Sequence, residues 1–414
     1  MKVVADLHLH SKYSRAVSPQ MELPSLAGWA QKKGVNLLGT GDFSHPLWFN
    51  ELKTQLVEAG SGFYRLRDDP SGVRFLLTNE ISNIYSAGSR TRKVHNIVSF
   101  PTLAAVEKFN GRLARIGNLG ADGRPILGLS ARDLLEIALE VDPDVLFIPA
   151  HAWTPHFSVF GSSSGFDSLT ECFGNLTPHI FAIETGLSSD PAMNWRLSAL
   201  DEIALLSFSD AHSPSRLMRE ATVFEIEPNY SDLVEAIRSK DPKKLLYTIE
   251  FFPQEGKYHF DGHRSCKFSC EPEVTKAQNY LCPVCGRALT VGVLHRVEKL
   301  ADRPAGFKPK SAIAFKNAIP LEQLIADVLG VGVSSQAVQA DYEEIVAQAS
   351  ELEVLLNFNE GELKKVAGPQ LALAILKARR GEVEIEPGYD GEFGKIKVFN
   401  SADAQTASNQ QSLF

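Results

Sequence analysis

The sequence predicts an α/β protein whose first domain is a barrel, followed by a four-cysteine module and a mainly helical C-terminal domain. Up to about residue 250, short apolar runs alternate with amphipathic stretches, which is typical of strands alternating with helices in a parallel sheet. This many repeats in one unit favours a barrel over an open sheet. The alternation then gives way to a cysteine cluster and further helical stretches, and 414 residues exceed one ordinary core.

The composition is that of a globular protein with no membrane partner. Apolar residues make up 44% of the chain and charged residues 22%, and no apolar run approaches membrane-spanning length. The N-terminus lacks the sections of a signal peptide, so we expect a cytoplasmic protein. The net charge of −8 argues against a nucleic-acid partner only if the charge is evenly spread. It is not evenly spread, as the region after residue 286 shows.

The predicted elements of the first domain follow from the apolar runs. Strands are expected within residues 2–9, 36–42, 73–81, 93–100, 144–151, 179–184, 203–212 and 221–226. Helices are expected within residues 23–34 and 130–141 of this domain, and within residues 319–330 and 368–381 of the C-terminal domain.

Metal-binding residue types recur at the ends of these strands, and in a βα-barrel the strand ends converge on one site. The residues are His8, His10, Asp42, Glu80, His95, His151, Glu184, Asp210 and His212. Any single histidine is more easily explained as a core or surface residue, but recurrence at strand after strand favours ligands. Imidazole and carboxylate together suit zinc, manganese or iron, and an acid that bridges two ions suits a multinuclear site. Such a site activates water and neutralises phosphate.

The stretches DLHLHS, NEIS, PAH and SDAH, in this order, resemble the motifs of the PHP (polymerase and histidinol phosphatase) family. The resemblance implies a distorted TIM-like (β/α)7 barrel over residues 1–252, with two or three divalent ions (Zn²⁺, Mn²⁺ or Mg²⁺) and phosphoester hydrolysis. It implies three ion sites. The first is held by His8, His10, Glu80 and Asp210, the second by Glu80, His95 and His151, and the third involves His212. Glu80 and Asp210 would be the catalytic acids.

Two departures from the family pattern alter the third ion site. Ser14, Arg15 and Ala16 stand where the family has an acid or histidine, and Asp42 of GTGD stands where a histidine is usual. The third ion is therefore weak or absent, or Asp42 supplies an oxygen ligand to it. Arg15 is a candidate catalytic residue that replaces the charge of this ion by binding a phosphate. The alternative for Arg15 is an ordinary surface salt bridge.

Four of the five cysteines predict a structural zinc module over residues 253–300. Cys266, Cys270, Cys282 and Cys285 have the spacing C-x3-C-x11-C-x2-C, and four thiolates so spaced can close a tetrahedron around Zn²⁺. A redox pair of Cys282 and Cys285 is the alternative, but it leaves the other two cysteines unexplained. Cys172 stands apart and is expected in the core.

The region after the zinc module is basic. Residues 287–316 hold seven Lys or Arg against two acids, whereas the whole chain is acidic. With Phe307 and Phe315 between the basic residues, this stretch suits a nucleic-acid backbone, and it begins the predicted DNA-binding helical domain, residues 301–399. A solvated basic loop is the alternative.

The layout of the whole chain resembles the endonuclease Q group, as do HLHSKYSRAVS, GTGD, SDPAMNWR, SDAHSP and PGYDGEFGKI. The resemblance implies a DNA repair endonuclease, which we expect to be a monomer, acting on damaged double- or single-stranded DNA. It would cut on the 5′ side of hypoxanthine, uracil, xanthine and abasic sites after flipping the base out. Trp153, His156 and Phe157 are candidate contacts to the flipped nucleotide, or else lid packing. A small-molecule phosphatase and a non-catalytic DNA-binding module are the alternatives.

The last fifteen residues, 400–414, form a polar tail that is expected to be disordered. Its end carries Gln410, Leu413 and Phe414, which resemble the Q-x-[SD]-L-F peptide with which bacterial repair and replication proteins bind the sliding clamp. The sequence therefore predicts a clamp-binding tail, with a tail of no function as the alternative.

Overall fold

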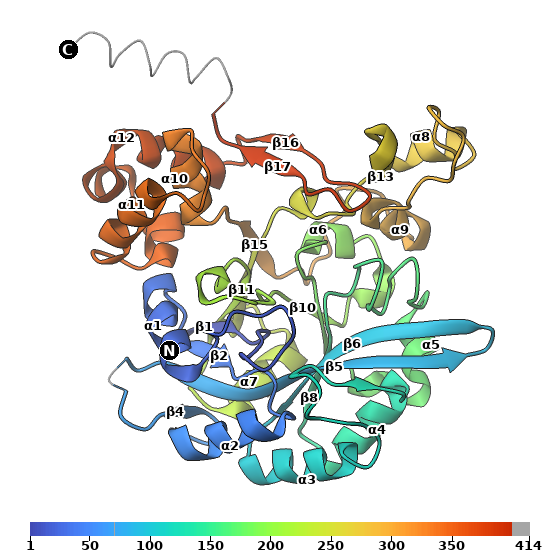
Figure 1. Ribbon diagram of the computed structural model, residues 1–414, viewed down its shortest axis with the longest axis vertical. Helices are drawn as coiled ribbons and strands as arrows, with labels where there is room; N and C mark the ends of the chain where they lie inside the picture. The colour runs from blue at the N-terminus through green and yellow to red at the C-terminus, as the bar shows by residue number, and fades with distance from the viewer. Residues whose placement is uncertain (70, 400–414) are drawn as a thin grey trace.

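The structure is a computed structural model that describes residues 1–69 and 71–399. A mixed β-sheet forms the centre of the larger part, with helices packed outside it, and the C-terminal helices and two hairpins lie over one end (Figure 1). The central sheet consists of β1 (Lys2–Asp6), β2 (Leu37–Gly39), β3 (Leu56–Glu58), β4 (Tyr64–Leu66), β5 (Arg74–Ala87), β6 (Arg90–Phe100), β7 (Ile126–Leu127), β8 (Leu146–Pro149), β11 (Ala221–Glu225), β12 (Leu245–Glu250) and β15 (Ala314–Asn317).

Two further strands, β9 (Ala182–Glu184) and β10 (Ala204–Leu206), pair with each other in parallel. Each apolar run that predicted a strand overlaps one of the observed strands, so the placement of these strands is confirmed, although β5 and β6 extend beyond their runs. The observed strands β2, β8, β9 and β10 are shorter than the apolar runs. Three of the runs reach residues at a left-handed backbone position, namely Asp42, His151 and Asp210, which extended strands do not adopt.

The strand directions differ from the parallel sheet that the alternation predicted. β1 pairs in parallel with β2, and β2 with β5, but β6 runs antiparallel to both of its neighbours, β5 and β8. No helix lies between β5 and β6, because a tight turn with Gly88 at φ 61° reverses the chain. His95 therefore lies in the middle of β6, and its ring reaches Glu80 of the adjacent β5.

The strands return toward their starting point in the order β1, β2, β5, β6, β8, β9, β10. Leu9, just after β1, pairs in parallel with Ala211, just after β10, and the His10 N–H donates to the Ala211 carbonyl at 3.1 Å. Between β8 and β9 the described residues form no strand ladder, although the Ala152 N–H donates to the Glu184 carbonyl at 2.9 Å. The α/β class is confirmed, whereas the closed (β/α)7 barrel stays a prediction.

The helices of the first part are α1 (Leu23–Lys33), α2 (Pro46–Gln55), α3 (Leu103–Leu113), α4 (Ala131–Val141), α5 (Leu169–Phe173), α6 (Pro191–Asn194) and α7 (Tyr230–Ser239). The predicted α1 and α4 are confirmed. The α4 helix begins where the Ser130 hydroxyl accepts the Asp133 N–H, and it buries Leu134, Leu135 and Ala138, which recur at helical spacing.

The second part holds α8 (Pro272–Ala277), α9 (Val293–Leu300), α10 (Leu321–Leu329), α11 (Gln336–Val346) and α12 (Glu360–Arg379), and the hairpins β13 (Asp261–His263) with β14 (Phe268–Cys270) and β16 (Glu384–Glu386) with β17 (Lys395–Lys397). The predicted helices at α10 and in α12 are confirmed. β15 joins the central sheet in parallel with β12. Residues assigned to the C-terminal domain therefore complete the sheet of the first, and the predicted domain limits stay predictions.

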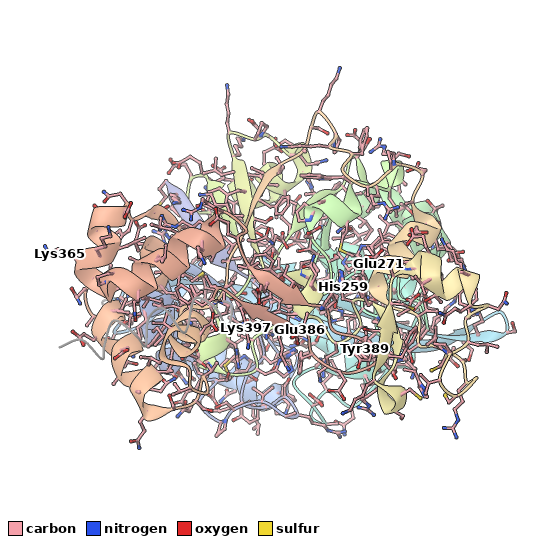
Figure 2. All side chains as sticks on the ribbon, turned by 90° about the horizontal axis from the view of Figure 1, so that it is seen from above. His259, Glu271, Lys365, Glu386, Tyr389 and Lys397 are labelled. Carbon is pink, nitrogen blue, oxygen red and sulfur yellow. The ribbon has the colours of Figure 1, made fainter. Side chains whose placement is uncertain are left out.

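The segment from residue 384 to 399 joins the C-terminal helices to the cysteine module. Figure 2 shows Glu386 and Lys397 on the β16–β17 hairpin between the helix that carries Lys365 and the module that carries Glu271. The Phe260 N–H donates to Gly388, and the Val398 N–H donates to Asp327 of α10 at 2.8 Å. The hairpin thus fixes both flanking units to each other.

Part of the basic region is used inside the protein. The Arg296 guanidinium is buried and donates to the Phe160 and Phe166 carbonyls and to Asp167, and Arg303 forms a two-pronged pair with Asp201. These two cations tie the region to the first part of the chain, so they do not count toward a DNA-binding surface.

Within residues 1–69 and 71–399, no helix combines the length and the apolar content that crossing a membrane requires. The predicted disordered tail and its clamp-binding residues Gln410, Leu413 and Phe414 lie outside the described residues.

Candidate metal centre

Two groups of side chains from distant parts of the chain converge at the strand ends. One group is His8, His10 and Asp210, and the other is Glu80, His95 and His151. Within each group the candidate ligand atoms all lie within 4.8 Å of one another. These six residues are the ligands predicted for the first two ions, and the structure brings all of them together.

His8 and His10 follow β1, and a carboxylate fixes each ring. Nδ1 of His8 is 2.9 Å from Glu184, and Nδ1 of His10 is 3.1 Å from Asp42. Such pairing turns the other ring nitrogen toward a metal. The Nε2 atoms of both rings and Oδ1 of Asp210 are buried without a hydrogen-bond partner. Oδ1 of Asp210 lies 3.7 Å from Nε2 of His8 and 3.2 Å from Nε2 of His10.

Glu80 lies between the two groups. Its Oε1 is 2.7 Å from Nδ1 of His95 and 3.0 Å from Nε2 of His151, and its Oε2 is 3.3 Å from Nε2 of His10. One carboxylate oxygen therefore faces each group. This is the position of a carboxylate that bridges two ions, as the sequence predicted.

The electrostatics of the cluster favour cation binding. Burial lowers the pKa of His95 to about 4, which leaves a neutral ring with a lone pair for a metal. Burial acts to raise the pKa of Glu80, but His95 and His8 outweigh it and hold that pKa well below its ordinary value. Burial likewise acts to lower the pKa of His8, but Glu184, Glu80 and Asp210 raise it well above the ordinary value. The buried negative charge that binds protons here would equally bind divalent ions.

Unpartnered buried ligand atoms, neutral imidazole and ionised carboxylate together fit a two-ion centre that suits Zn²⁺ or Mn²⁺. The backbone at this centre is strained, because His151 and Asp210 both have positive φ, at 32° and 47°. Gly186 permits the turn at His151, since a Cβ at this glycine would come within 2.6 Å of the His151 Cβ.

Asp42 has a role other than the predicted one of an oxygen ligand. Its Oδ1 faces His10, and its Oδ2 accepts hydrogen bonds from the Ser11 N–H at 2.6 Å, the Ser11 hydroxyl at 2.7 Å and the Ser14 hydroxyl at 2.8 Å. Because the carboxylate is fully buried and both oxygens are engaged, it orients His10 instead of binding an ion. The prediction of Asp42 as a ligand is therefore corrected.

His212, the residue predicted for a third ion, stands outside both groups. Its ring packs against His10 with centroids 4.7 Å apart, and its Nδ1 is 2.9 Å from the Asp210 carbonyl. In the described part of the chain, no third group of potential ligands forms around it.

Arg15 does not reach the centre. Its side chain is 77% exposed, and its Nε is 3.4 Å from Asp122, so the salt-bridge alternative is the correct one. Arg124, whose Nη1 lies 3.1 Å from Oε2 of Glu80, was not predicted as a site residue. Arg124 lies in a loop far from every motif, so no local pattern marked it.

A pocket of about 320 Å³ adjoins the ligands. Its walls include His151 and Asp210 of the centre, the predicted contacts His156 and Phe157, and Lys257, Tyr258 and Phe393 from the second part of the chain. Trp153 does not line it. This side chain is fully buried and its indole N–H donates to Asn194 at 2.7 Å, which agrees with the packing alternative and not with substrate contact.

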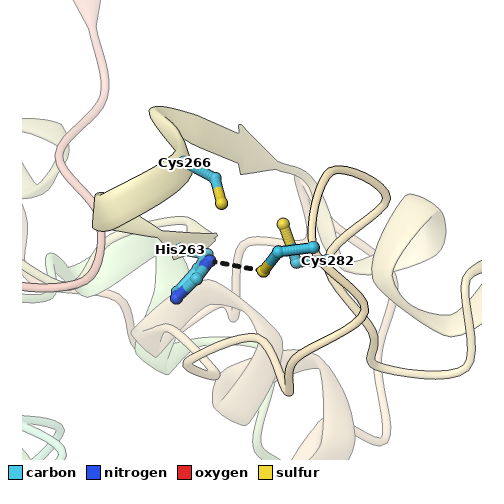
Figure 3. A group of neighbouring side chains, drawn as sticks. His263, Cys266 and Cys282 are labelled. Carbon is cyan, nitrogen blue, oxygen red and sulfur yellow. Dashed lines mark hydrogen bonds between the residues drawn. The ribbon is translucent and has the colours of Figure 1, made fainter.

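The cysteine module forms a separate metal-ligand group. His263, Cys266, Cys282 and Cys285 come together, and Figure 3 shows the side chains of the first three converging. Burial acts to raise the pKa of Cys282, but the N–H groups of Val284 and Cys285 lower it to about 6, so the thiolate that binds zinc is present at neutral pH. This group suits a tetrahedral structural zinc.

The fourth member of this group differs from the sequence prediction. Cys270, at the end of β14, lies outside the group, and its thiol contacts the Thr275 hydroxyl at 3.2 Å. His263, at the end of β13, takes its place, with Nδ1 3.3 Å from the Cys285 sulfur. The spacing His-x2-Cys from His263 to Cys266 is the signal that could have identified it.

Sequence comparison identifies a matching family and related proteins from two organisms. Residues 320–382 match the family described as the MJ0043 C-terminal domain. The chain is 32% identical to the Bacillus subtilis protein YqxK over 416 residues, covering 96% of this chain and 99% of YqxK. It is 35% identical over 272 residues to protein MJ0043 of Methanocaldococcus jannaschii, covering 62% of this chain and 33% of MJ0043. The match thus spans a third of the length of MJ0043.

Two solved structures are similar over almost the whole chain. The lesion-specific endonuclease PfuEndoQ from Pyrococcus furiosus has a TM-score of 0.86 and 33% identity, covering 98% of this chain and 99% of PfuEndoQ. Endonuclease Q in complex with a 27-mer duplex substrate, which has an abasic lesion at the active site, has a TM-score of 0.85 and 34% identity over 97% of both chains.

Proposed function

The chain belongs to the endonuclease Q family, as its sequence indicated, and on this premise we propose that it is a metal-dependent endodeoxyribonuclease of DNA repair. One observation carries the proposal. Two metal-ligand groups lie beside a pocket, with Glu80 of one group facing His10 of the other, in a chain that matches a lesion-specific endonuclease over 98% of its length. A small-molecule phosphatase would not need the second part of the chain, which supplies Lys257, Tyr258 and Phe393 to that pocket.

The residues of the centre have distinct roles in this proposal. His8, His10, Glu80, His95, His151 and Asp210 would hold two divalent ions, which when bound supply an activated water and neutralise charge on the phosphate. Glu184 and Asp42 orient His8 and His10 from behind. His8, His10 and Glu80 are buried, and this low-dielectric surrounding would strengthen the attraction between bound ions and a phosphodiester.

The proposed substrates are DNA strands that carry deaminated bases (hypoxanthine, uracil, xanthine) or abasic sites, cut on the 5′ side. The pocket beside the centre, with the rings of His156, Phe157 and Phe393 in its walls, is of a size and character that suits a flipped nucleotide. We also propose one structural zinc in the cysteine module, a monomeric enzyme in the cytoplasm, and a clamp-binding role for Gln410, Leu413 and Phe414. The clamp proposal rests on sequence alone.

The test is incubation of the purified protein with labelled duplexes that each carry one lesion, in the presence of Mn²⁺ or Mg²⁺. We expect a nick on the 5′ side of the lesion, none in an undamaged duplex, and none after treatment with EDTA. Release of phosphate from a generic monoester with every duplex left intact would instead identify a small-molecule phosphatase. Tight DNA binding with neither reaction would identify a non-catalytic module.

A further inference from the structure

Arg124 brings a positive charge to the metal centre from the segment between α3 and β7. Its Nη1 is 3.1 Å from Oε2 of Glu80, the oxygen that also faces His10. The side chain is 27% exposed and lines the pocket together with His151 and Asp210. The guanidinium therefore lies between the ligands and the space where a substrate enters.

The backbone that carries Arg124 is fixed on both sides. Asp122 accepts the Arg124 N–H at 3.1 Å, and the Gly123 N–H donates to the Tyr13 carbonyl at 3.1 Å. A Cβ at Gly123 would come within 2.2 Å of Oδ2 of Asp42 and 2.5 Å of the Ser14 hydroxyl. Only glycine fits there, so residues 122–124 are pressed against Asp42 and Ser14.

This contact occupies the position where the resemblance to the PHP family placed a third ion. Asp42 and Ser14 are the residues that replace the usual ligands there, and the backbone of Gly123 now covers them. The centre thus lacks one cation relative to a three-ion site, and the segment that covers Asp42 and Ser14 brings a guanidinium instead. Arg15 does not supply that charge, because it faces solvent and pairs with Asp122.

We propose that Arg124 is a catalytic residue that binds a non-bridging oxygen of the phosphodiester to be cut, in place of a third metal ion. The inference rests on the proposed nuclease function. Guanidinium offers five N–H donors in a plane that matches phosphate, and within residues 1–69 and 71–399 this one donates a single hydrogen bond, to Glu80. The remaining donors have an acceptor once a phosphate enters the pocket.

The first experiment measures binding without metal or turnover. Wild-type protein, R124M and the control R15M are titrated in EDTA with an abasic duplex. In this duplex the linkage on the 5′ side of the lesion is either a normal phosphodiester or an uncharged methylphosphonate. Wild type and R15M should bind the normal duplex roughly tenfold or more tightly, since the methylphosphonate loses the charged hydrogen bond between Arg124 and the phosphate. R124M should bind both duplexes equally. A preference that survives in R124M would overturn the assignment.

The second experiment measures single-turnover nicking and bound manganese. R124M should nick about 10²- to 10³-fold more slowly than wild type, as when one donor to a transition-state oxygen is removed, while binding as much Mn²⁺. R124K keeps the charge without the planar fork and should fall between them, which covers the case that R124M does not fold. Unchanged nicking, or a slow rate explained by lost Mn²⁺, would overturn the inference. If wild type nicks no lesion, the proposed function fails, while the binding comparison still decides the role of Arg124.

Discussion

Single carboxylates decide which nitrogen of each histidine faces the metal centre. Glu184 and Asp42 take Nδ1 of His8 and His10, so that both Nε2 atoms point at Asp210. An imidazole held in this way is a better ligand, because its orientation and tautomer are fixed before the metal arrives. The centre is therefore organised by residues that bind ions and by residues that only hold the ligands.

Asp210 is the sharpest test of the ligand assignment. We expect D210N to reduce nicking of lesion duplexes to background, since the amide removes the negative charge that faces both Nε2 atoms. Binding of DNA in EDTA and the midpoint of thermal unfolding should stay close to wild type. Turnover near the wild-type rate would show that Asp210 is not a ligand.

D42N is the matched control for a carboxylate that orients a ring without binding an ion. Loss of such a partner lowers metal affinity or activity by about 10- to 100-fold, so D42N should nick slowly but measurably.

The Asp42 prediction from sequence failed for a physical reason. A carboxylate after a strand is equally suited to bind an ion or to hold a histidine, and only the hydrogen bonds from Ser11 and Ser14 distinguish the two.

At the scale of the elements, strand positions could be predicted and strand directions could not. The runs around β5 and β6 are apolar, but their antiparallel pairing depends on the turn at Gly88. This turn explains why His95, near the start of the apolar run 93–100 but in the middle of β6, reaches Glu80 at 2.7 Å. Residue type at the strand ends marked the six candidate ligands among nine residues, and the resemblance to the PHP family selected them. Arg124 could not be predicted, because a loop contact across the fold places it.

The β13–β14 hairpin decides the composition of the proposed zinc site. It pairs His263 with Phe268 and Asp261 with Cys270, so the side chains of His263 and Cys270 stand at opposite ends of the ladder. His263 lies beside Cys285, and Cys270 lies beside Thr275 of α8. Thiolate spacing alone counts cysteines and cannot detect this choice.

Zinc analysis of three variants tests the hairpin assignment. C282S and H263A should each lower the zinc content by one ion per chain and lower the thermal stability of residues 253–300, because the bound ion contributes directly to folding. C270S should keep its zinc. Retention of zinc by H263A together with its loss in C270S would restore the four-cysteine site that the spacing predicted.

Across the whole molecule, the second part of the chain completes the pocket of the first. Lys257 lies over the Phe393 ring at 4.4 Å, and both line the pocket beside His151. Backbone N–H groups on both sides of Phe393 donate to the carbonyls of Gln254 and Lys257 and to the Asp327 carboxylate. The sequence layout indicated these units in order, but contacts between segments more than one hundred residues apart required the structure.

The end of the chain carries the residues that we propose to bind the sliding clamp. β17 ends beside α10, where Asp327 accepts the Val398 and Phe399 N–H groups, and the chain then continues to Gln410, Leu413 and Phe414. We expect deletion of residues 410–414 to abolish binding to a bacterial sliding clamp in calorimetry, because two large apolar side chains and the glutamine supply the contact. The affinity of the full chain should be on the order of micromolar, since the peptide must be ordered on docking. Nicking of a short duplex without clamp should not change, which distinguishes loss of clamp binding from loss of catalysis.

The double variant L413A/F414A is the matched control, because it keeps the length of the tail and should lose clamp binding equally. Undiminished binding by either variant would show that another surface contacts the clamp.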